Sequence, residues 1–160
     1  MQTPEPMVPP RSSADPYEGR PAPRQAVSGY WGERLAWIAS LVLAISAFTD
    51  WYAGSTSDGL TLSVTGWHTG ALGKLVFFAG LATLILEALR EAGIELPATV
   101  PESLVLIALG SLATIFVLIR VISIPDAYFA TAGRGIGIFI SLIAAVALIV
   151  AGLLRAAEEL

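Results

Sequence analysis

The chain contains no cysteine, a single histidine and few charged side chains. Without cysteine, disulfides, thiolate metal sites and thiol nucleophiles are excluded. A metal site built on the lone histidine, His68, would need further ligands, so we expect neither a metal nor another cofactor. The formal net charge of −4 leaves no basic surface for nucleic acid, which we therefore exclude as a partner.

The most prominent feature of the sequence is a set of long apolar runs. Apolar residues make up 55% of the chain and charged residues only 14%, whereas about a quarter of a soluble domain is charged. Four runs have the length of an α-helix that crosses the hydrocarbon core of a bilayer, which is about 30 Å thick. We predict an all-α membrane protein, in which residues 29–160 form an antiparallel bundle of four transmembrane helices. The predicted spans are residues 35–51, 71–89, 104–124 and 135–154.

Residues 1–28 have a different composition from the rest of the chain. They hold seven of the ten prolines, mixed with charged residues and serine. Such a segment buries too little apolar surface to offset its ordering entropy, so we expect a disordered, proline-rich cytoplasmic tail. The tail is either a docking peptide for a cytosolic partner or a solvated leader without a ligand.

The basic residues predict the orientation in the membrane. Six lie on the side of the two termini and three on the other side, and the side richer in Lys and Arg is usually cytoplasmic. We therefore expect a multi-pass plasma-membrane protein with both termini in the cytoplasm. The six are Arg11, Arg20, Arg24, Arg34, Arg90 and Arg155, and the three are Lys74, Arg120 and Arg134.

The loop after the first span has a pattern of its own. Apolar and hydroxyl residues alternate over residues 59–65, which is the period of a strand with one buried face. A turn signal precedes it, and residues 51–55 supply a returning strand. We predict a short extracellular β-hairpin across the mouth of the bundle, with Leu60, Leu62 and Val64 directed at protein or lipid headgroups.

Small residues recur at every fourth position along the first and last spans. Such ridges allow close approach of helix backbones, which favours association in lipid. They predict either packing inside the bundle or an interface with another membrane subunit or a second copy. The first ridge is Gly32, Ala36, Ser40 and Ala44, and the second is Gly133, Gly137, Ser141 and Ala145.

Charged residues lie only near the ends of the predicted spans. Glu87 and Arg90 have the i,i+3 spacing of a local ion pair. Arg120, about one turn inside the outer end of its span, has three interpretations: an anionic headgroup site, an ion pair with Asp50 or Asp126, or an interfacial anchor.

Trp67 and His68 complete the outer-face candidates. Tryptophan is enriched at membrane interfaces, so Trp67 needs no ligand to explain it. Catalysis by His68 would need an acid or nucleophile, and Asp50 and Asp58 are the acids nearest in sequence. No such constellation stands out, so we expect no catalytic residues.

Several short motifs between residues 31 and 154 resemble a recurrent type of small four-span membrane protein of high-GC Gram-positive (actinobacterial) bacteria. The resemblance implies a plasma-membrane location and no activity. The layout, with an outer β-element after the first helix, is also similar to that of claudins, whose loop carries a cysteine pair that this chain lacks. The motifs are Trp51-Tyr52, Gly66-Trp67, Arg120 followed by Pro125, and Gly135-Ile136-Gly137.

Three function classes remain. The leading hypothesis is a non-enzymatic scaffold, assembly factor or accessory subunit of a larger membrane complex, with the lipid bilayer and another membrane protein, or itself, as partners. The alternative is a component of an oligomeric transporter or channel. The third is an outer-face membrane enzyme that uses His68, Asp50 and Arg120.

Overall fold

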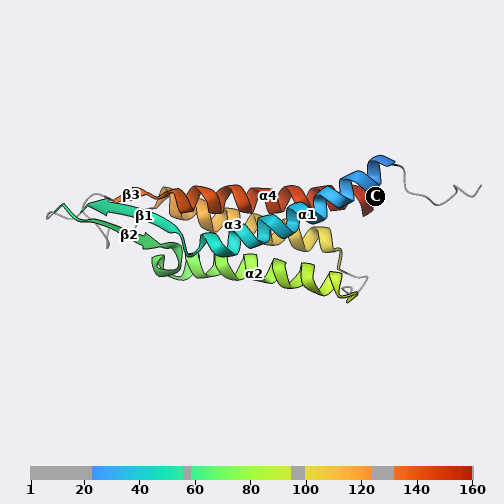
Figure 1. Cartoon of the computed structure of the whole chain (residues 1–160), viewed down its shortest axis with the longest axis horizontal. Helices are drawn as coiled ribbons and strands as arrows, with labels where there is room; N and C mark the ends of the chain where they lie inside the picture. The colour runs from blue at the N-terminus through green and yellow to red at the C-terminus, as the bar shows by residue number, and fades with distance from the viewer. Residues whose placement is uncertain (1–22, 56–58, 95–99, 124–131, 160) are drawn as a thin grey trace, which may run out of the picture.

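The computed structural model describes residues 23–55, 59–94, 100–123 and 132–159. Within these residues, four long helices form an elongated bundle with a small antiparallel sheet at one end (Figure 1). We call this the sheet end, and the opposite end, where α1 begins and α4 finishes, the terminal end. The helices are α1 (Pro23–Ser46), α2 (Ala71–Glu91), α3 (Glu102–Ile122) and α4 (Ile136–Glu159).

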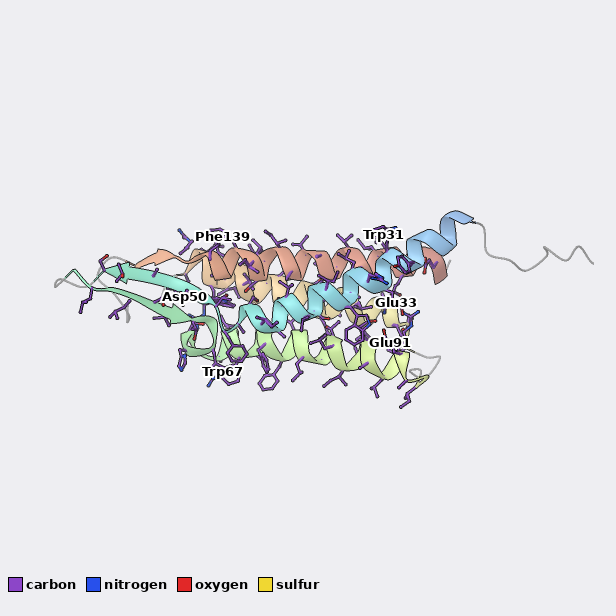
Figure 2. All side chains as sticks on the ribbon, viewed as in Figure 1. Trp31, Glu33, Asp50, Trp67, Glu91 and Phe139 are labelled. Carbon is purple, nitrogen blue, oxygen red and sulfur yellow. The ribbon has the colours of Figure 1, made fainter. Side chains whose placement is uncertain are left out.

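The interior of the bundle combines many alanines with a few larger apolar side chains such as Leu43 and Leu148, and further large apolar side chains cover its outside. Successive helices are neighbours, and α4 also packs along α1 and closes the bundle. Ala36, Ala113 and Ala145 are fully buried, whereas Ile143 is 70% exposed. Phe139 likewise lies on the outside (Figure 2). This is the distribution expected in lipid, where close backbone contact rather than apolar burial holds helices together. Three helices, α2, α3 and α4, are long and apolar enough to cross a membrane.

The first helix differs from its predicted span. It begins at Pro23, inside the stretch expected to be a tail, and it ends at Ser46 rather than at residue 51. Residues 1–22 lie outside the described residues. The apolar part of α1 is confined to residues 35–46, which cover about 18 Å at 1.5 Å per residue and so fall short of a full span.

A turn closes α1 early because its last carbonyl groups find other donors. The backbone N–H of Phe48 donates to the carbonyl of Ile45 at 2.9 Å, and that of Thr49 donates to Ser46 at 3.1 Å. The indole of Trp51, which is fully buried, donates to the same Ser46 carbonyl at 2.9 Å. Helix ends need such partners, especially away from water. Trp51 is therefore not the last residue of the helix but part of a strand.

The predicted hairpin is present as β1 (Asp50–Ser55) and β2 (Thr61–Thr65). Gly59, before β2, has φ +78°, which favours glycine. A third strand, β3 (Ala132–Arg134), was not predicted; it pairs with β1 and gives the order β2-β1-β3. Gly133 lies in this strand, so its predicted place on the last helix is wrong. The sheet extends along the axis of the bundle instead of lying across its mouth (Figure 1).

The close approach of α1 and α2 makes a specific prediction for Gly80. A Cβ atom at this position would lie 2.7 Å from the backbone nitrogen of Ala44 and 3.0 Å from the carbonyl oxygen of Ser40. We expect Gly80→Ala to force the helices apart and to lower the free energy of unfolding by about 1–3 kcal/mol. Helix loss during titration with sodium dodecyl sulfate, followed by circular dichroism, measures this change.

Gly32→Ala is the matched control, because the nearest atom to a Cβ there is the Leu154 side chain at 3.3 Å. Both substitutions raise helix propensity equally. Equal unfolding curves for the two variants would contradict the close contact at Gly80.

Candidate functional site

Both ridges of small residues are used within the chain. All of their residues except Gly133 are buried. Ser40 and Ala44 of α1 face Gly80 of α2, and the carbonyl of Ala145 in α4 lies 3.1 Å from a Cβ built on Gly110 in α3. The ridges therefore pack the helices of this bundle against one another and leave little of themselves for another subunit.

Hydroxyl groups in the bundle are also engaged internally. The hydroxyl of Ser141 in α4 donates to Ser46 Oγ in α1 at 2.7 Å, and Ser46 donates to the carbonyl of Leu43 at 2.7 Å. Thr83 and Thr114 each donate to a carbonyl four residues earlier in their own helix, at 2.9 and 2.7 Å. These bonds satisfy polar groups that water does not reach, so the hydroxyls do not line an open polar route.

The strongest electrostatic feature is a cluster of four charged residues at the terminal end. Arg155 Nη2 of α4 lies 2.5 Å from Glu87 Oε2 of α2, and the two side chains are only 7% and 1% exposed. Glu102 of α3 accepts a weaker contact from Arg155 at 3.9 Å and one from Arg90 at 3.5 Å. The predicted local pair of Glu87 with Arg90 is therefore wrong, and each of these residues pairs with another helix instead.

The cluster joins three helices at a buried point. Glu87 Oε1 and Arg155 Nε are buried without a hydrogen-bond partner among the described residues. A buried charge is costly unless it is paired, so the contact between Glu87 and Arg155 specifies how α2 and α4 meet. The sequence carried a signal for it: one acid and one base, each at the same end of an apolar run, gain from a partner of opposite charge.

Arg120 joins elements at the sheet end. Its Nη2 donates to the carbonyl of Thr69, in the short 3₁₀ helix η1 (Gly66–Thr69), and its own carbonyl accepts the hydroxyl of Tyr52 at 2.7 Å. Among the described residues it forms no ion pair with Asp50, and Asp126 lies outside them. Arg120 therefore ties α3 to η1 and β1.

Trp67 belongs to an aromatic cluster on the outside of the sheet end (Figure 2). Its ring stacks on Phe48 at 5.5 Å between centroids and meets Phe77 edge-on at 5.4 Å. Lys74 Nζ lies 5.5 Å from the centre of the same ring, within the range of a cation–π contact. This grouping of aromatic and cationic side chains is typical of a membrane interface.

His68 is exposed and lies beside Trp67 in η1. Its Nδ1 is 2.8 Å from the hydroxyl oxygen of Thr65. In the part of the chain that the structure describes, no group of three or more His, Cys, Asp and Glu residues is placed to hold a metal. The three outer-face candidates, Arg120, Trp67 and His68, thus lie at one end of the molecule but make separate contacts.

The buried pair predicts an asymmetry between single and double substitutions. Arg155→Met leaves the Glu87 carboxylate buried and unpaired, so we expect it to destabilise the bundle by about 3–5 kcal/mol. Adding Glu87→Leu removes the uncompensated charge, so the double variant should regain most of that loss. Unfolding in detergent, followed by circular dichroism, measures both.

Lys74→Met is the control for loss of a cation at an exposed position. It should change the unfolding curve little. If the double variant were as unstable as Arg155→Met, the ion pair would not be the source of the effect.

No relative emerged from comparisons with known proteins. Searches against protein-family models, curated proteins and solved structures each gave no match. The function must therefore be inferred from the contacts and chemistry of this chain.

Proposed function

We propose that this protein is a non-enzymatic, multi-pass plasma-membrane protein that acts as a scaffold, assembly factor or accessory subunit of a larger membrane complex. In this proposal the fourth crossing consists of the apolar part of α1 together with the residues that follow it up to Trp51, it packs beside α4, and both termini lie in the cytoplasm. The sheet then lies outside the cell. The apolar surfaces of α2, α3 and α4 and the basic residues near the terminal end support this arrangement.

The outer sheet is the observation that carries the proposal of a partner. It extends beyond the helices, and β2 is one of its edge strands (Figure 1). Leu60, just before β2, is 64% exposed, and Leu62, within β2, is 48% exposed. Val64 differs, because its side chain packs on the core. An apolar edge strand that projects into water is a surface that proteins normally cover or use for strand addition. We therefore assign this edge to contact with another protein.

The alternative of an oligomeric transporter has less support. In the part of the chain that the structure describes, the four helices enclose an apolar core rather than a polar path, and the hydroxyls of Ser46, Thr83, Thr114 and Ser141 are engaged in internal hydrogen bonds. A path would have to form between copies of the chain. Solute flux through vesicles that contain only this protein would favour the alternative.

The proposed topology can be tested by labelling single introduced cysteines. The chain has no cysteine of its own, so each introduced thiol is the only one in the protein. In intact cells, a membrane-impermeant maleimide should label Thr61→Cys and should leave Ser12→Cys and Ala157→Cys unlabelled until the membrane is opened. Labelling of Ser12→Cys from outside would show that α1 does not cross the bilayer and would reduce the protein to three spans.

The proposed partner contact predicts a face-specific effect on the sheet. The double substitution Leu60→Asp and Leu62→Asp should lower the amount of a specific partner cross-linked to the protein in intact cells by about tenfold or more, since charged groups would enter an apolar contact. Quantitative mass spectrometry of the cross-linked material measures this loss.

Thr61→Asp with Ser63→Asp is the matched control, since it adds the same charge to the alternate positions of β2. It should preserve the cross-linked partner. An equal loss in both double variants would indicate damage to the sheet rather than loss of a contact, and an equal yield in wild type and both variants would rule out this edge.

A further inference from the structure

A cleft opens between α1 and α2 at the terminal end. It has a volume of about 370 Å³, and Figure 2 shows two of its acidic residues, Glu33 and Glu91, at this end of the two helices. Its walls combine aromatic, acidic, basic and apolar side chains. The lining residues are Tyr30, Glu33, Arg34, Trp37, Ile38 and Glu91.

The cleft holds charges of both signs and one unused donor. Within the described part of the chain, the indole Nε1 of Trp37 is buried without a hydrogen-bond partner, and neither Glu33 nor Glu91 forms an ion pair. The guanidinium of Arg34 lies 4.7 Å from the centre of the Tyr30 ring. The guanidinium can donate hydrogen bonds to an anion and the two carboxylates can accept them from a cation, while the orphaned N–H group of Trp37 belongs to the same wall.

An apolar groove lies on the other side of Ile38. This side chain, which is 60% exposed, lines both depressions and stands between them. The groove runs between α1 and α4, has a volume of about 290 Å³ and exposes only apolar surface. Its other lining residues are Leu35, Ala39, Val42, Ile140, Ile143, Ala144 and Ala147. A polar cleft and an apolar groove separated by one side chain suit an amphiphile with a compact headgroup and a hydrocarbon chain that passes over Ile38.

We propose that this surface binds a phospholipid of the inner leaflet with a primary ammonium in its headgroup, such as phosphatidylethanolamine. The lipid phosphate accepts hydrogen bonds from Arg34 and from the indole of Trp37. Its ammonium donates to Glu33 and Glu91, and one acyl chain crosses Ile38 into the groove. The inference rests on the membrane insertion in the proposed function, but not on any protein partner.

The charges of the cleft decide which phospholipid fits. Two carboxylates against one guanidinium disfavour a net anionic lipid such as phosphatidylglycerol, since like charges repel. A quaternary ammonium binds best inside a cage of aromatic faces, and Arg34 already lies over the Tyr30 ring. A primary ammonium has three donors and suits two carboxylates.

Retention of lipid by the full chain tests the proposal. The protein is reconstituted in vesicles with equal amounts of phosphatidylethanolamine, phosphatidylglycerol and phosphatidylcholine, then extracted in mild detergent and examined by native mass spectrometry. We expect about tenfold preferential retention of phosphatidylethanolamine over each of the other two, the effect of one charge-assisted hydrogen bond. Glu33→Gln with Glu91→Gln should abolish the preference.

Two further variants separate the headgroup from the chain. Trp37→Phe keeps an aromatic ring but removes the N–H donor, and it should weaken retention of every phospholipid severalfold. Ala147→Leu should fill the groove and do the same, whereas Ala108→Leu, on the exposed side of α3, should not. Asp50→Asn controls for loss of an acid at the sheet end and should leave the preference intact.

The outcomes distinguish this site from the proposed function. Equal retention of the three lipids, a preference for phosphatidylglycerol, or a preference that survives the double glutamine variant would overturn the lipid site alone. Flotation of the protein with the vesicles is checked first. A protein that does not float would overturn the proposed membrane insertion, and the lipid site with it.

Discussion

The arrangement of the sheet end depends on one buried residue, Trp51, which contacts α1, η1 and the start of α4. Its indole donates to the Ser46 carbonyl at the end of α1, and its own carbonyl accepts the N–H of Gly135, before α4, at 2.7 Å. A Cβ on Gly66 would lie 2.5 Å from the ring, so η1 fits there only with glycine. One buried residue, through its side chain and its backbone, thus fixes the sheet, η1 and α4 relative to α1, and with them the surface that we assign to a partner.

The terminal end is organised by charge rather than by an aromatic ring. The buried contact of Glu87 with Arg155 holds α2 to α4, and Glu102 extends it to α3. The neighbouring cleft keeps its charges at its surface and uses none of this cluster. Charges that stabilise the bundle are therefore separate from those available to a ligand.

Local patterns predicted much of the fold, and contacts distant in sequence account for what was missed. The alternation over residues 59–65 predicted β2, because a period of two is visible in the strand itself. The three residues of β3 have no period, and their partner strand is far away in the chain. Likewise Glu87 was assigned to Arg90 by spacing, but its partner Arg155 is 68 positions away. The run at 35–51 located α1 but not its end, since a buried strand residue such as Trp51 is as apolar as a helical one. The cleft was missed because Glu91 and Glu33 line the same depression only when α2 folds back along α1.

The position of β3 has a consequence for biogenesis. β1 and β2 are adjacent in the chain, whereas β3 follows α2 and α3. In a chain inserted as proposed, β3 reaches β1 only after both helices have crossed the bilayer in the right directions. The sheet is therefore completed late, by a contact of high sequence separation. Until then β1 keeps an open edge, so an outer surface with all three strands forms only on molecules that are correctly threaded.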